Sequence, residues 1–310
     1  MFRRSVEALV ADERSKQHHV VAERLSNVLS RSGSRRPPQA RHRDEVSPDY
    51  LTVRLPKRGL DDVRLQPETR AVVHELVEEH ERADLLRSYG LEPRHRVLLT
   101  GPPGNGKTTL AEAVAGALAL PLYTVRYESL IGSYLGETST RIDRMFEYVR
   151  SHPGVLFFDE FDAVGKERSD DNDVGELKRV VSTLLLQIDA LPSYVVAVAA
   201  TNHPDLLDRA AWRRFEVVLD LPPPTPAEVR SWISVLFERL DFPARVPHPN
   251  ALRALKGMSY ADVEQAVLDA MRRYVLESPK ANAGELFKRS MKTRAAYRRP
   301  PSSEAAEENG

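Results

Sequence analysis

The feature that most constrains the fold is a glycine-rich sequence, GPPGNGKT, at residues 101–108. It fits the pattern G-x-x-x-x-G-K-[S/T] in full. The apolar run RVLLT precedes it at 96–100 and helical periodicity follows over 107–118, so it joins a predicted strand to a predicted helix. The glycines let successive backbone amides face one anion, and the helix N-terminus adds partial positive charge. The sequence therefore predicts a phosphate-binding loop at the end of a buried strand.

The loop assigns distinct roles to its last residues. Lys107 is expected to reach the β- and γ-phosphates of a nucleoside triphosphate, and the Thr108 hydroxyl is expected to bind Mg²⁺. The loop residues predicted to contact the nucleotide are Pro103, Gly104, Asn105, Gly106, Lys107, Thr108 and Thr109.

Short apolar runs alternate with helical segments through the middle of the chain. The predicted strands are 96–100, 122–126, 155–159, 194–200 and 216–219. The helical segments are 69–88, 107–118, 138–150 and 175–190. Runs this apolar are typical of strands that helices cover on both faces. The alternation predicts an α/β fold with a doubly wound parallel sheet.

A different pattern follows the three prolines at 222–224, where helices are expected at 226–240, 250–255 and 259–276 without a strand. We interpret this part as a small, all-helical lid. The predicted organisation is an N-terminal helical segment, an Arg/Ser/Pro-rich linker, the α/β domain, the lid and a disordered tail. These parts occupy residues 1–30, 31–48, 49–224, 225–287 and 288–310.

Polar side chains follow two of the predicted strands. Asp159 and Glu160 come after the apolar residues LFF, at the strand end where α/β sheets bind ligands. Asp159 would hold Mg²⁺ and Glu160 would polarise an attacking water, which favours hydrolysis. Asn202, after the next strand, could position that water or contact the γ-phosphate. Glu160 as a second solvated carboxylate and Asn202 as a strand-to-turn residue remain the alternatives.

Composition excludes several classes of protein. The 45 basic and 45 acidic residues cancel, which argues against nucleic acid or an anionic membrane as the partner. The absence of cysteine excludes disulfides, thiol catalysis and cysteine-ligated zinc. No apolar run is long enough to cross a bilayer and no export signal is predicted, so we expect a cytoplasmic protein.

Taken together, these motifs resemble those of the AAA ATPases over about residues 59–277. GPPGNGKT is similar to their Walker A motif, FFDEFD to Walker B and ATNHPDLLD to the sensor 1 region. GMSYADV at 257–263 resembles the run that opens the last helical part of the lid, and GLDDV at 59–63 resembles the segment against the adenine. The resemblance implies that ATP is the nucleotide, with Asp62 and Val63 beside its base.

Two further similarities concern neighbouring subunits and substrate. Arg213 and Arg214 lie where the family places arginine fingers, although the motif is shortened and the principal finger is left open. Tyr134, Leu135 and Gly136 occupy the position of an aromatic–hydrophobic–glycine pore loop, 27 residues after Lys107. The alternatives are a surface arginine pair in salt bridges and a tyrosine that packs onto its own domain.

The resemblance implies a Mg²⁺-dependent ATPase that assembles into a homo-oligomeric ring, which we expect to be a hexamer. Such a ring would unfold, remodel or translocate a protein through its pore, with a separately encoded protease or effector as a further partner to test. A P-loop ATPase that acts on nucleic acid is one alternative, supported by the basic linker and tail. A nucleotide-gated assembly scaffold is the other.

Overall fold

The computed structural model describes most of the chain after residue 47. The described residues are 48–130, 135–164, 173–207, 209–248, 252, 257–277 and 281–297. The predicted N-terminal helices and linker lie outside them, as does most of the helix expected at 250–255. The chain divides into two compact units: the first comprises Met1–Leu99 and Thr108–Leu219, and the second comprises Thr100–Lys107 and Asp220–Gly310.

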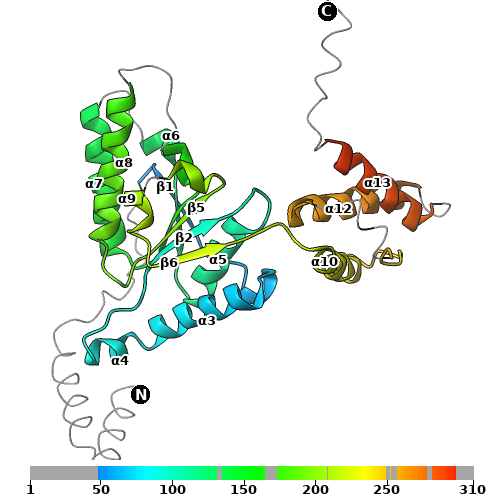
Figure 1. The fold of residues 1–310 in the computed structure, drawn as a ribbon, viewed down its shortest axis with the longest axis horizontal. Coiled ribbons are helices and arrows are strands. Elements are labelled where there is room, and N and C mark those ends of the chain that lie inside the picture. The colour runs from blue at the N-terminus through cyan, green and yellow to red at the C-terminus, as the bar shows by residue number, and fades with distance from the viewer. Residues whose placement is uncertain are drawn as a thin grey trace, which may run out of the picture. The chain divides into compact units, whose positions relative to one another are not determined.

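A six-stranded sheet forms the centre of the first unit (Figure 1). Its strands are β1 (Leu51–Arg54), β2 (Arg96–Thr100), β3 (Leu122–Val125), β4 (Val155–Phe158), β5 (Val196–Thr201) and β6 (Val217–Asp220). The order is β1-β3-β4-β5-β2-β6, and the pairs β3–β4 and β4–β5 are parallel. The predicted α/β class is confirmed, and all five predicted strands are present with ends within two residues. β1 was not predicted; it is an antiparallel edge strand that pairs Leu51 with Val125.

Helices cover both faces of this sheet. They are α3 (Pro67–Glu81), α4 (Ala83–Ser88), α5 (Lys107–Ala117), α6 (Tyr127–Leu130), α7 (Leu135–Ser151), α8 (Asp173–Asp189) and α9 (Arg209–Trp212). Figure 1 shows α7 and α8 side by side on one face, with α3 and α5 on the opposite face. The single helix expected at 69–88 is two helices, because the backbone of Arg82 leaves the helical conformation (φ −107°, ψ 25°).

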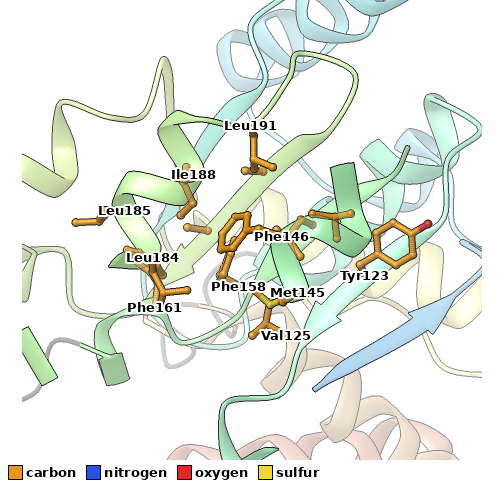
Figure 2. Packing of buried hydrophobic residues seen from close by; sticks show 14 of the residues in the cluster. Tyr123, Val125, Met145, Phe146, Phe158, Phe161, Leu184, Leu185, Ile188 and Leu191 are labelled. Carbon is orange, nitrogen blue, oxygen red and sulfur yellow. The ribbon is translucent and has the colours of Figure 1, made fainter. Parts of the chain in front are cut away.

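The main core lies between the sheet and the pair α7–α8 (Figure 2). Phe158 of β4 belongs to it and packs against Phe146 and Phe161, with ring centroids 6.4 and 5.9 Å apart. Alternate residues of a strand face opposite sides, so the equally buried Val155 and Phe157 face away from this core. Burial on both faces explains the uninterrupted apolar run. The buried run ends at Phe158, so Asp159 is the first polar residue after β4.

In the described part of the second unit, helices pack around a core of their own; they include α10 (Pro226–Arg239), α12 (Tyr260–Glu277) and α13 (Ala283–Tyr297). The side chain of Thr225 caps α10 by accepting a hydrogen bond from the amide of Glu228. The helices expected at 226–240 and 259–276 are therefore present. No helix in the described part of the chain is both long and apolar enough to span a membrane.

The expected disorder from residue 288 onward is wrong as far as Tyr297, where α13 ends. Phe287 and Met291 lie one helical turn apart and are both buried in the core of the second unit. The Phe287 ring packs edge-on against Phe237, with centroids 5.1 Å apart. Burial of this pair orders a segment whose many basic residues suggested a solvated tail. Residues 298–310 lie outside the described residues.

Candidate active site

The phosphate loop has a backbone that only glycine adopts readily. Gly104 and Gly106 have φ angles of +80° and +92°. Turns of this hand bring consecutive amides to one side, which is how backbone loops bind anions. Lys107 is 7% exposed, and its ammonium donates to the carbonyls of Gly101 (2.6 Å) and Pro102 (3.1 Å). The loop therefore combines turned amides with a buried cation, as the sequence predicts for a phosphate site.

The start of α12 contacts this loop, within the second unit. The carbonyl of Gly104 accepts a hydrogen bond from the amide of Ala261 (3.1 Å). A β-carbon on Gly104 would lie 2.5 Å from the hydroxyl oxygen of Ser259. Ser259 in turn caps α12: its Oγ accepts from the amide of Asp262 (3.1 Å), and its own amide donates to the Asp262 carboxylate (3.0 Å). The loop and the first turn of α12 therefore share one set of contacts.

Asn105 carries an unpaired amide in the same loop. Its side chain is 3% exposed, and neither Nδ2 nor Oδ1 has a hydrogen-bond partner among the described residues. Buried amides in proteins are normally paired, because an unmade hydrogen bond leaves the cost of desolvation uncompensated. A group of this kind inside a phosphate loop fits a site that gains hydrogen bonds when a polar ligand binds.

In the first unit, the hydroxyl and the carboxylate predicted to bind Mg²⁺ meet. Thr108 Oγ1 donates to Asp159 Oδ2 at 3.0 Å, and the amide of Glu160 donates to the other oxygen of Asp159, also at 3.0 Å. One hydroxyl and one carboxylate are hard oxygen donors of the kind that Mg²⁺ binds, so the residues fit this ion. The side chain of Glu160 is exposed and its φ is +48°, a left-handed conformation that is unusual for a residue with a β-carbon.

The ends of β4 and β5 are tied together by Asp162, a residue to which the sequence reasoning gave no role. Asp162 is buried, and its Oδ1 accepts from the Thr201 hydroxyl (2.9 Å) and from the amide of Asn202 (3.3 Å). These bonds hold Asn202 at the carboxyl edge of the sheet, where the sequence predicts it. The signal was present in the repeated acid of FFDEFD, but nothing in the sequence shows that its partner is Thr201.

Tyr127 is a second residue that the sequence reasoning missed. It begins α6, and its ring packs against the main core while its hydroxyl oxygen is fully buried. Burial, and then the charges of Asp159, Asp162 and Glu160, raise the pKa of the Tyr127 phenol. That oxygen has no hydrogen-bond partner among the described residues. No motif in the sequence indicates this placement.

The residue directly before the predicted adenine segment contacts α5. The Arg58 guanidinium donates to the hydroxyl of Thr109 (3.0 Å). Asp62 accepts from the amide of Gly59 (2.8 Å) and so closes a tight turn. Val63 is buried, and its carbonyl accepts from Arg70 (3.1 Å). Asp62 and Val63 are thus part of an ordered segment, and Thr109 contacts the residue directly before that segment.

The two candidate arginine fingers have different surroundings. Arg214 forms an ion pair with Asp189 at the end of α8. Arg213 is exposed and has no ion pair with another residue of the described part of the chain. Tyr134 of the predicted pore loop lies outside the described residues. Leu135 and Gly136 are the first residues of α7, and the structure does not describe the side chain of Leu135, so the pore loop stays a prediction.

Comparison with known proteins identifies similar chains and a matching family. The model of the family described as "ATPase family associated with various cellular activities (AAA)" matches residues 97–223. An uncharacterized AAA family ATPase, y4kL, of Sinorhizobium fredii is 36% identical over 304 residues, which cover 96% of this chain and 91% of the relative. A putative 26S proteasome regulatory subunit homolog of Methanothermobacter thermautotrophicus is 31% identical over 245 residues, covering 78% of this chain and 65% of the relative.

A third relative is much longer than this chain. The peroxisomal ATPase pex6 of Schizosaccharomyces pombe is 39% identical over 189 residues, which cover 58% of this chain but 20% of the relative. The similarity to this relative therefore concerns one part of it. The match of y4kL along nearly its whole length, together with the family model, establishes that the chain belongs to the AAA family of ATPases.

Proposed function

We propose that this ATPase uses Mg²⁺-dependent ATP hydrolysis to remodel protein substrates as one subunit of a homo-oligomeric ring. The observation that carries the catalytic part is the 3.0 Å contact between Thr108 and Asp159, with Glu160 directly after Asp159. It supports the reading of these residues as a metal-binding pair beside a general base.

In this proposal, the phosphate loop neutralises the triphosphate. The ammonium of Lys107 and the loop amides would exchange their present partners for phosphate oxygens, and each hydrogen bond to a charged group contributes about 1.5–3 kcal/mol. Asp62 and Val63 would position the adenine at the other end of the nucleotide. Mg²⁺, held by Thr108 and Asp159, would supply charge stabilisation to the phosphates.

Glu160 would take up or polarise the proton of the attacking water. Its carboxylate is exposed, and its left-handed backbone turns the chain away from the direction of β4. A conformation of this kind costs about 1–2 kcal/mol in a residue with a β-carbon. That cost is compatible with a role in positioning the side chain. Asn202, which Asp162 holds by its backbone, would orient the same water.

A neighbouring subunit would complete the site. Arg213 is the better candidate for a finger, because it is exposed while Arg214 pairs with Asp189. The ion pair of Arg214 would then hold the segment between α9 and β6 against α8 and fix the direction from which Arg213 projects. A ring supplies such an arginine to every site, and we expect this ring to be a hexamer.

The protein-remodelling part of the proposal draws on the relatives and on the predicted pore loop. One relative carries the name of a proteasome regulatory subunit homolog and another that of a peroxisomal ATPase. Tyr134 would grip an extended polypeptide through its aromatic ring, which binds with little regard to sequence. A separately encoded protease or effector would act on the product.

The test is the coupling between ATP turnover and unfolding in Tyr134→Ala. We expect the number of fluorescent model-substrate molecules unfolded per ATP hydrolysed to fall at least about tenfold, the loss typical of truncating one aromatic anchor. Tyr89→Ala, which removes an exposed tyrosine after α4, is the matched control and should keep the wild-type ratio. An unchanged ratio in Tyr134→Ala, together with stimulation of hydrolysis by DNA, would favour the nucleic-acid alternative.

A further inference from the structure

The buried hydroxyl of Tyr127 needs an explanation that the fold does not provide. A buried phenol normally finds a hydrogen-bond partner, because the cost of removing the hydroxyl from water is otherwise uncompensated. The ring of Tyr127 contributes to the main core, and phenylalanine would do the same. The hydroxyl has no partner among the described residues, so it adds nothing to the packing. Its role has to come from its position.

That position is the carboxyl edge of the sheet. Tyr127 follows β3, and β3 is the parallel neighbour of β4, whose end leads into Asp159. Three acidic residues near the end of β4, namely Asp159, Asp162 and Glu160, act electrostatically on the phenol. A phenol is protonated at neutral pH and can therefore serve these carboxylates as a hydrogen-bond donor.

Among the three acids, Asp159 is the best partner. Its charge acts on the phenol more strongly than that of Asp162 or Glu160. Each of its two oxygens accepts one hydrogen bond, from Thr108 and from the amide of Glu160, which leaves lone pairs for another donor. Carboxylates that bind metals are commonly oriented by such hydrogen bonds, and loss of one typically lowers metal affinity.

We propose that Tyr127 is a positioning residue of the ATPase site. Its buried hydroxyl, which makes no hydrogen bond to a described residue in this structure, donates to the carboxylate of Asp159 once Mg²⁺ and the nucleotide are bound, and so orients that carboxylate toward the ion. The proposal rests on the proposed function, which makes Asp159 a ligand of that ion. All of the residues concerned belong to the first unit.

The experiment removes the oxygen alone, with Tyr127→Phe in the full chain that also carries Glu160→Gln, so that the nucleotide is not consumed. Binding of N-methylanthraniloyl-ATP is measured by fluorescence over a range of free Mg²⁺ concentrations. We expect the Mg²⁺ concentration for half-maximal binding to rise about tenfold or more. Binding measured in EDTA should not change. Tyr123→Phe makes the same chemical change at a buried tyrosine on β3 and is the matched control.

A thermal melt without nucleotide or metal separates positioning from structure. If the hydroxyl is an unpaired group without function, Tyr127→Phe raises the melting temperature and leaves the Mg²⁺ dependence as it was, which overturns the proposal. An equal shift of the Mg²⁺ dependence in Tyr123→Phe overturns the proposal as well, because the effect would then follow from the loss of either tyrosine hydroxyl and would not be specific to Tyr127.

Thr108→Val distinguishes a failure of this inference from a failure of the proposed function. If Thr108→Val raises the Mg²⁺ requirement and Tyr127→Phe does not, only the role of Tyr127 is refuted. If nucleotide binding does not depend on Mg²⁺ even before these changes, the metal site itself is refuted, and the inference falls with it.

Discussion

Replacement of Gly104 by alanine tests whether the phosphate loop and the lid helix are built as one structure. The backbone of Gly104 has φ +80°, and a left-handed conformation costs a residue with a β-carbon about 1–2 kcal/mol. The new β-carbon would also lie 2.5 Å from the Ser259 hydroxyl oxygen, and overpacking of this kind costs about 1–3 kcal/mol. We therefore expect Gly104→Ala to lower the free energy of unfolding of the second unit by about 2–5 kcal/mol.

Gly257 offers a matched control, because its φ is +88° but no atom of the described residues lies within 4 Å of the position of a β-carbon. Gly257→Ala should cost only the backbone part, about 1–2 kcal/mol. Urea denaturation can be followed through Trp232 of α10 after Trp212, the other tryptophan, is replaced by phenylalanine. Equal losses in the two alanine variants would refute the contact between Gly104 and Ser259 as a constraint on the loop.

Two further predictions concern the lid and the subunit interface. Phe287→Ala should destabilise the second unit by about 3–5 kcal/mol in the same Trp232 assay. Lys288→Ala, at an exposed neighbouring residue, should stay within about 0.5 kcal/mol of wild type. A small loss of stability in both variants would contradict the burial of α13. Arg213→Ala should lower ATP turnover about 10³-fold and keep nucleotide binding, as expected for an arginine finger. Mixing it with Lys107→Ala subunits should restore part of the turnover, and a mixture as inactive as its components would count against a finger supplied by a neighbour.

The parts of the fold that the sequence predicts are those set by local patterns. The apolar run before Asp159 predicts β4 because residues such as Phe157 and Phe158 are buried on opposite faces. β1 has no such pattern: only Leu51 is buried, and its place depends on pairing with Val125, 74 residues further along the chain. α13 was missed for a related reason, because Phe287 and Met291 are helical only through their burial in the second unit.

The residues of the candidate site also differ in whether the sequence alone predicts them. The phosphate loop is contiguous, so its glycines and Lys107 can be recognised without a structure. The pairing of Asp159 with Thr108 follows from knowing that both motifs lie at the same edge of the sheet. Tyr127 could not be predicted, since it lies far along the chain from Asp159 and a tyrosine after a strand is ordinary. Only the three-dimensional arrangement shows that its hydroxyl is buried beside the acids.

The most direct test of the account is the ATP turnover of Glu160→Gln, measured beside its affinity for ATP. The substitution keeps the size of the side chain and its neighbours but removes the group that would act on water. We predict that ATP binding stays close to that of the wild type while turnover falls by about 10²–10⁴, the contribution of a general base. Turnover equal to that of the wild type would contradict the assignment of Glu160 and, with it, the proposed mechanism of hydrolysis.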